Sequence, residues 1–180
     1  MHVLDHLTQE HRKAEDLMDR LSRSEPGAER DGLLQELHDS LGTHMAVEER
    51  FIYPLISDDI DEEAAADATD EHELSRRALA DLVARADEGA FVDALEMLRK
   101  GIDHHVDEEE SELFPKLRER AADELADMDP EDLEAKVERS PDTIDLTRDE
   151  LYEKAKEQDV AGRSSMTKEE LAHAVGEESS

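Results

Sequence analysis

The chain has no cysteine and no tryptophan, and its 180 residues include only three phenylalanines and two tyrosines. Without cysteine, the chain cannot form disulfides, thiolate metal sites or a cysteine nucleophile. The scarcity of aromatic side chains also argues against a β-sheet, because strands favour aromatic and β-branched residues. We therefore expect an all-α fold with an aliphatic core.

Long apolar runs and basic residues are scarce as well. No apolar run approaches the about 18–20 residues of a membrane span, and residues 1–5 lack the basic and apolar regions of a signal peptide. We expect a cytoplasmic protein without a membrane partner. The chain carries 21 basic and 52 acidic side chains, a net charge of −31. Such a charge repels phosphate backbones and anionic lipids, so nucleic-acid binding by the chain as a whole is not expected.

Apolar residues recur at helical spacing in four segments, at about residues 3–21, 29–56, 61–88 and 91–121. The connections between these segments are short. Long helices joined in this way favour an antiparallel four-helix bundle. We assign this bundle to residues 1–124.

The second half of the bundle repeats the first at an offset of 61 residues. The polar residues that this offset pairs are His11 with His72, His44 with His105, Glu48 with Glu109, Glu10 with Glu71, and Glu49 with Glu110. Each half thus contains a lone histidine followed by a His-x-x-x-Glu motif. Residues four apart lie on one face of a helix, so the two side chains of each motif can converge. A single such pair is weak support in a glutamate-rich chain, but the duplication separates these two pairs from that background.

Six of the repeated polar residues fall on the apolar stripes and are predicted to face the core: His11, His44, Glu48, His72, His105 and Glu109. Burying four histidines and two carboxylates without compensation costs several kcal/mol. A bound metal supplies that compensation, whereas the alternative is a metal-free core in which these side chains hydrogen-bond to one another. We favour the metal, because imidazole and carboxylate suit iron or manganese and helix bundles bind paired metals through inward-facing ligands.

The order and spacing of these residues resemble the hemerythrin-like, or HHE cation-binding, family over about residues 1–122: His11, His44-x-x-x-Glu48, His72 and His105-x-x-x-Glu109. The resemblance implies a four-helix bundle with a non-haem di-iron centre. It implies that the first two histidines bind one iron, that the last two bind the other, and that the two glutamates bridge the pair. An oxo or hydroxo group or a small ligand would complete the site, and manganese is an alternative to iron.

One position departs from the oxygen carriers of that family, which have a fifth histidine one turn after the ligand on the third helix. Here that position is Arg76, whose guanidinium has no lone pair for a metal. The open coordination place favours peroxide or nitric oxide over reversible oxygen carriage. We expect Arg76 to pair with Glu15 across the bundle, the alternative being that Glu15 is an extra ligand. His104 is expected beside the site or in solvent.

Two segments follow the bundle. Residues 125–143 are predicted to form an acidic helical connector, with Asp129 capping a helix that begins at Pro130. Residues 144–176 contain two capping boxes, at 147–150 and 167–170, and are predicted to form a small helix–extended-loop–helix module. This module resembles the N-terminal helical module of the Rho termination factor.

The Rho-like resemblance implies association with nucleic acid and would nominate Arg163, Ser164 and Lys168 for it. However, residues 144–180 contain 5 basic and 10 acidic side chains. This charge favours a structural role or docking of a protein partner over nucleic-acid binding.

These observations predict a di-iron protein that binds or turns over a small oxidant such as dioxygen, peroxide or nitric oxide. Catalase-like consumption of peroxide is one activity that such a centre allows. One alternative is an iron or redox sensor, or an iron-handling protein, that signals through its C-terminal module. Another is a nucleic-acid-associated stress protein in which the bundle is a scaffold. Peroxide turnover by iron-loaded protein separates the first function from the second, and salt-sensitive binding of DNA or RNA would favour the third.

Overall fold

The computed structural model describes residues 1–86 and 89–138, together with Tyr152 and Lys156. In this part of the chain all regular secondary structure is helical, as the sequence predicted. None of the described helices is both long and apolar enough to cross a membrane. The Rho-like module predicted at 144–176 lies outside the described residues, apart from Tyr152 and Lys156.

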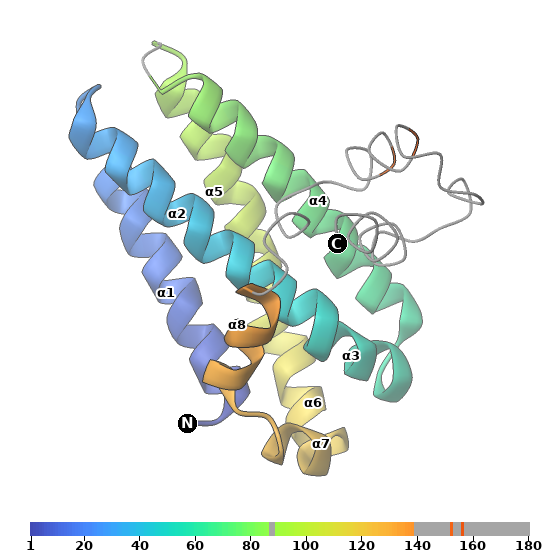
Figure 1. Ribbon diagram of the computed structural model, residues 1–180. Helices are drawn as coiled ribbons and strands as arrows, with labels where there is room; N and C mark the ends of the chain where they lie inside the picture. The colour runs from blue at the N-terminus through green and yellow to red at the C-terminus, as the bar shows by residue number, and fades with distance from the viewer. Residues whose placement is uncertain (87–88, 139–151, 153–155, 157–180) are drawn as a thin grey trace.

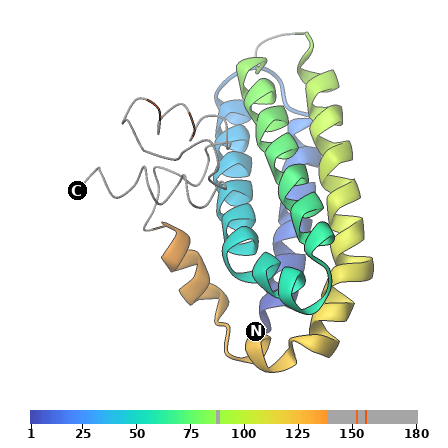
Figure 2. The ribbon, with the colours of Figure 1, turned by 90° about the vertical axis from the view of Figure 1, so that its right-hand side faces the viewer.

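Four helical rods lie side by side, consistent with a hemerythrin-like helical bundle (Figure 1). The first and third rods are single helices, α1 (Val3–Leu21) and α4 (Glu62–Ala84). Each of the other two contains a short π-helical segment between α-helices: α2 (Ala28–Val47), η1 (Glu48–Ile52) and α3 (Tyr53–Asp59), then α5 (Phe91–Glu108), η2 (Glu109–Leu113) and α6 (Phe114–Arg120). Along the chain, each rod returns in the direction opposite to the one before it (Figure 2).

The two π-helical turns occupy equivalent places in the repeat. The backbone N–H of Tyr53 donates to the carbonyl of Glu48, and that of Phe114 donates to the carbonyl of Glu109, five residues back in each case. The next residue is a proline, which has no N–H to continue the α-helical ladder. We predicted unbroken helices at 29–56 and 91–121, so the π turns correct that prediction. One added residue in a turn moves the following side chains by about 100° around the helix axis.

The apolar stripes of the rods form two hydrophobic clusters, one toward each end of the bundle. Leu37 and Leu98 belong to one cluster, and Leu7, Ile56 and Leu117 belong to the other. All five side chains are fully buried. The polar residues predicted to face the core therefore lie between two apolar regions that exclude water from both sides.

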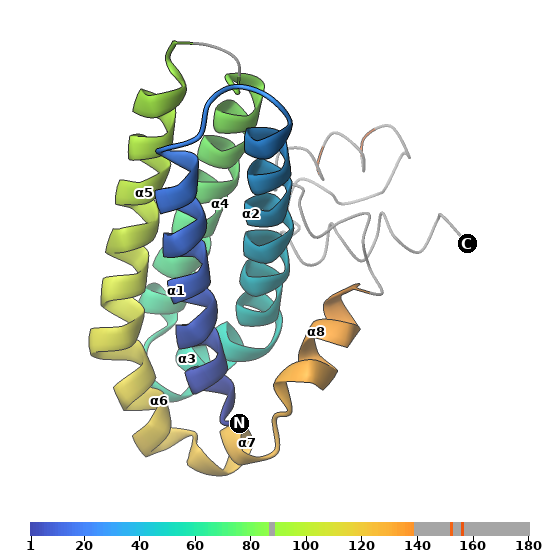
Figure 3. The ribbon, with the colours of Figure 1, turned by 90° about the vertical axis from the view of Figure 1, so that its left-hand side faces the viewer.

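After the fourth rod the chain turns back on the bundle through α7 (Ala122–Ala126) and α8 (Pro130–Glu138) (Figure 3). As predicted, α8 starts at Pro130, and the carboxylate of Asp129 accepts a hydrogen bond from a backbone N–H in its first turn. Leu133 and Val137 of α8 are buried in the cluster that contains Leu7. The described part of the predicted connector, residues 125–138, is thus packed against the bundle.

Candidate metal centre

The six predicted metal ligands come from all four rods and meet between the two apolar clusters. His11 lies on α1 and His72 on α4, whereas each His-x-x-x-Glu motif spans the junction of an α-helix and its π turn. All six side chains are buried, and Glu48 and Glu109 are 0% exposed. The repeat therefore brings two equivalent sets of donors to one level of the bundle.

One half of the centre gathers His11, His44, Glu48 and Glu109. The Nε2 atoms of His11 and His44 are 3.1 Å apart, and Oε2 of Glu48 lies 3.1 Å from Nε2 of His44. Oε2 of Glu109 lies 3.4 Å from Nε2 of His11. Neighbouring ligands on one octahedral metal lie about 3.0 Å apart when each bond is about 2.1 Å long. This group can hold a metal ion.

The other half gathers His72, His105 and the same Glu48. The two Nε2 atoms are again 3.1 Å apart, and Oε2 of Glu48 lies 3.3 Å from Nε2 of His72. Oε1 of Glu109 lies 3.5 Å from Nε2 of His105. Both glutamates therefore face both halves, and the histidines divide two and two, in the grouping that the family resemblance implied.

Tyr53, which the sequence analysis did not single out, also points into this second half. Its hydroxyl oxygen lies 2.9 Å from Nε2 of His72, 3.4 Å from Nε2 of His105 and 3.2 Å from Oε1 of Glu109. In an unbroken α-helix Tyr53 would lie about 140° around the axis from Glu48. The π turn between them moves Tyr53 to the inner face, which is why α-helical periodicity did not find it.

A second set of carboxylates holds the four imidazoles from outside. Each Nδ1 contacts one glutamate: His44 with Glu10 at 3.1 Å, His105 with Glu71 at 2.9 Å, His11 with Glu110 at 2.8 Å, and His72 with Glu49 at 2.9 Å. A carboxylate can only accept, so Nδ1 donates its proton and the lone pair of Nε2 points into the centre. Such carboxylates fix the orientation and tautomer of metal-binding histidines. The sequence did contain their signal, because the 61-residue offset pairs these glutamates too.

Burial and charge set the protonation of the centre. Burial, with the facing Glu109, raises the pKa of Glu48 well above its usual value. Burial lowers the pKa of His72 to about 3, so this imidazole is neutral at pH 7. Burial also works against an ionised Glu109, but the neighbouring histidines, His105 above all, outweigh it and lower the pKa of Glu109 to about 2. Glu48 thus favours its protonated form and Glu109 its ionised form, and a metal bound by both would displace the proton of Glu48.

The centre has unsatisfied lone pairs that fit a bound cation. Both carboxylate oxygens of Glu48 and Oε2 of Glu109 are buried without a hydrogen-bond partner. A buried acceptor left in this state costs about 1–3 kcal/mol. In addition, the two Nε2 atoms of each half face each other at 3.1 Å. A cation in each half satisfies these atoms together, so the residues fit metal ions.

A small cavity of about 20 Å³ adjoins all four histidines on the side away from the two facing carboxyls. Leu41 and Ile102, which line it, come one turn before His44 and His105, whereas the glutamates come one turn after them. Its walls also include the apolar Ala14, Met45 and Val106, together with the polar Glu10, Ser40 and Ser75. A volume of about 10–15 Å³ on this measure holds one water. The cavity therefore has room for one or two water-sized groups, about the size of a diatomic molecule or peroxide.

Comparison with known families agrees with this geometry. A family model described as the hemerythrin HHE cation binding domain matches residues 2–117. The chain belongs to this family. No curated protein and no solved structure gave a match. The matched residues of this hemerythrin-family chain include all six predicted ligands and Tyr53, and they end before α7.

The position where this chain departs from the oxygen-carrying hemerythrins is filled differently from our prediction. Nη1 of the buried Arg76 lies 2.8 Å from Oε1 of Glu49, the same oxygen that accepts the Nδ1 proton of His72. Glu15 pairs instead with Arg12 at the surface, at 2.8 Å. The predicted pair of Arg76 with Glu15 is therefore wrong. Helical spacing correctly placed Arg76 on an inner face, but it could not show that Glu49 is the nearer carboxylate.

Glu15 as an extra ligand is also not supported, since it lies in none of the candidate metal groups of the described residues. Other histidines lie outside the centre. His6 lies 3.9 Å from the carboxylate of Glu10 and 2.6 Å from that of Glu134 of α8. The side chain of His104 is 65% exposed.

Proposed function

We propose that this chain is a non-haem di-iron protein that binds or turns over a small oxidant, of the class of dioxygen, peroxide or nitric oxide. One observation carries the proposal: two groups of buried donor atoms share Glu48, Glu109 faces histidines of both groups, and the histidines adjoin a small cavity. Membership of a cation-binding family supports the metal.

The proposed ligands divide between two metals. His11 and His44 would hold one iron, His72 and His105 the other, and the two shared glutamates would bridge them with an oxo or hydroxo group. Manganese accepts the same nitrogen and oxygen donors and is the alternative metal. Bound iron would supply one-electron chemistry that no side chain offers.

The protein itself would position the imidazoles, exclude water from the centre and select substrates by their size. The carboxylates on the Nδ1 atoms hold each imidazole with its lone pair inward. The aliphatic walls of the cavity offer little to water but accept a weakly hydrated molecule. Its volume excludes larger substrates, which favours a diatomic molecule or peroxide.

Metal analysis and an optical spectrum of protein purified from iron-replete cells test the proposal. We expect about two irons per chain, as the family resemblance implies, and a spectrum that changes on addition of peroxide or nitric oxide. His105→Ala should lose iron because it removes a donor, whereas His104→Ala removes a neighbouring, largely exposed imidazole and should keep iron. A parent protein without iron, or equal iron in both variants, would contradict the di-iron proposal.

A further inference from the structure

The two halves of the centre differ at one pair of equivalent positions. The 61-residue offset pairs Tyr53 with Phe114. Each is the first residue after a π turn, and each side chain lies beside a histidine of the centre. The ring of Phe114 stacks near His11 with the ring centroids 6.1 Å apart, and it has no donor atom. Tyr53 instead brings an oxygen among the donors of its half.

The hydroxyl of Tyr53 has the spacing of a ligand to the second metal. It lies 2.9 Å and 3.4 Å from the Nε2 atoms of His72 and His105, and 3.2 Å from Oε1 of Glu109. These separations match those among the other donors of the same half, which are 3.1–3.5 Å. Ligands of one octahedral metal are expected about 3.0 Å apart. The oxygen thus lies where a further ligand of this metal would lie.

Arg76 leaves room for such a donor. It occupies the position one turn after His72, but its guanidinium has no lone pair and bonds to Glu49. The half that contains Arg76 at this position is also the half into which Tyr53 points. A phenolate oxygen is a good ligand for iron, as the tyrosine-ligated haem of catalase shows.

We infer that Tyr53 is a ligand of the metal held by His72 and His105, and that the two metals of the centre therefore have different protein ligands. This inference rests on the proposed function, since it requires a metal in that half. When the phenol oxygen binds the metal, its proton passes to solvent and no electron is transferred. The half that contains Phe114 keeps the fewer protein ligands and the more open coordination sphere. We therefore assign the small oxidant to the metal held by His11 and His44.

The plain alternative is a phenol that only hydrogen-bonds within the core. A hydroxyl has one proton to donate, so in that role Tyr53 would serve one of its three neighbours and would leave the optical properties of bound iron unchanged. A phenolate bound to ferric iron, in contrast, produces a visible charge-transfer absorption. The two roles are therefore separable by spectroscopy, without any measurement of activity.

The experiment uses the full chain, loaded with ferrous iron without oxygen and then oxidised. Its visible spectrum and iron content are compared for the parent, Tyr53→Phe and Tyr152→Phe. Tyr152 is the only other tyrosine and lies outside the matched domain, so its variant is the matched control. We expect the parent and Tyr152→Phe to show the phenolate band, and Tyr53→Phe to lose it while keeping most of its iron. Resonance Raman spectra of the parent, excited in that band, should show enhanced phenolate ring vibrations even if Tyr53→Phe folds poorly.

Two results distinguish this inference from the proposal on which it rests. A parent with two irons but no phenolate band, or a Tyr53→Phe variant with an unchanged band, would overturn the role of Tyr53 and leave the di-iron centre standing. A parent that binds no iron would overturn the proposed function itself, and this inference with it.

Discussion

Glu71 shows what a single carboxylate outside the centre contributes. Its hydrogen bond from His105 lowers the pKa of Glu71, so this side chain is an ionised acceptor at neutral pH. Glu71→Gln keeps the shape but removes the charge that orients the imidazole. We expect it to lower metal affinity by about 10–100-fold, measured by competition with a chelator. Glu108→Gln, at an exposed neighbouring position, is the control and should bind as tightly as the parent. Equal affinities in all three proteins would contradict this role.

The protonation of Glu48 should couple metal binding to pH. Burial beside Glu109 raises the pKa of Glu48, so the metal-free carboxyl keeps its proton to a higher pH than an ordinary glutamate does. A metal needs the carboxylate, so loading should release about one proton from this residue. The sign follows: metal affinity rises with pH until the metal-free carboxyl is itself ionised. Calorimetry in two buffers of different ionisation enthalpy measures the released protons, and a heat of binding independent of buffer would refute the linkage.

The gathering of the six proposed ligands in one buried group was predictable from sequence, because a fixed offset and i,i+4 spacing are both visible in one dimension. The partner of Arg76 was not. The guanidinium of Arg76 lies 2.8 Å from Glu49 and 3.8 Å from Glu73, whereas Glu15 pairs with Arg12, and this outcome depends on how far apart the rods lie. Periodicity gives the face of a helix but no distance across the bundle.

At the scale of the element, the π turn determines which side chain after Glu48 or Glu109 faces the centre. Arg50 lies in η1 and Ser111 is its equivalent in η2, and both are exposed. Deleting Arg50 should restore an α-helical turn and move Tyr53 by about 100° away from the centre. We expect this deletion to abolish the phenolate band, whereas deletion of Ser111 should keep it.

Both deletions also rotate the helix that follows, so both should lower the melting temperature. The contrast between their spectra, not their stability, is therefore informative. If both deletion variants keep the band, the π turn does not position Tyr53.

The rods themselves were predicted well because apolar residues recur along them at helical spacing. The π turns escaped detection because Ile52 and Leu113 follow Glu48 and Glu109 at a spacing of four, which an unbroken α-helix also explains. Because the added residue lies near the end of each rod, too few apolar positions follow it to reveal the shift in helical periodicity.

At the scale of the whole molecule, α8 closes one end of the bundle. Leu133 and Val137 are buried there, and each such side chain contributes about 1.5–3 kcal/mol through burial. A chain ending at residue 126 should therefore melt about 10 °C or more below a chain ending at residue 140. Both should bind metal equally at low temperature, because every proposed ligand precedes residue 126. Equal melting temperatures would show that α8 adds nothing to the stability of the bundle.

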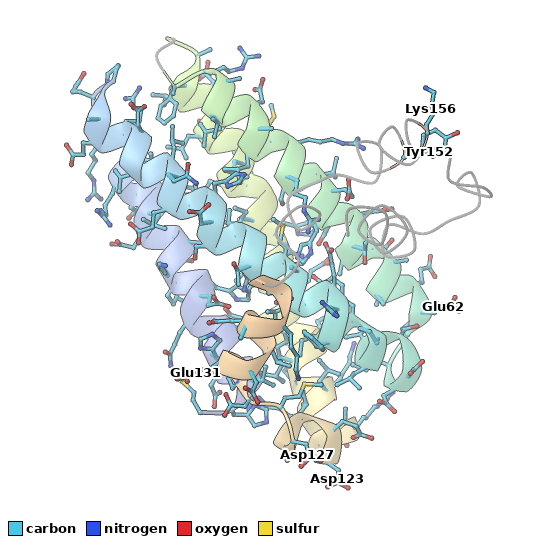
Figure 4. The ribbon with its side chains drawn as sticks, in the orientation of Figure 1. Glu62, Asp123, Asp127, Glu131, Tyr152 and Lys156 are labelled. Atoms are coloured by element: carbon cyan, nitrogen blue, oxygen red, sulfur yellow. The ribbon has the colours of Figure 1, made fainter. Side chains whose placement is uncertain are left out.

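The net charge of −31 acts on the molecule as a whole. Acidic side chains such as Asp123, Asp127 and Glu131 project from the end of the bundle that α7 and α8 cover (Figure 4). A surface of this sign attracts cations and speeds their arrival. We expect the rate of ferrous iron uptake to fall as salt rises from about 0.01 M to 1 M, over which the screening length shrinks from about 30 Å to 3 Å. Stopped-flow absorbance measures this rate, and a rate that does not change with salt would contradict the expectation.

The contacts of Glu49 and Glu110 cross between the two hairpins. Glu49 of the first hairpin holds His72 of the second, and Glu110 of the second holds His11 of the first. A half-length chain would therefore have to pair with a second copy of itself to complete either site. In such a homodimer every substitution appears twice, and both metals stay identical. After gene duplication and fusion, each half of the chain can change on its own. Tyr53 at the position equivalent to Phe114 is a difference that only a fused chain can encode.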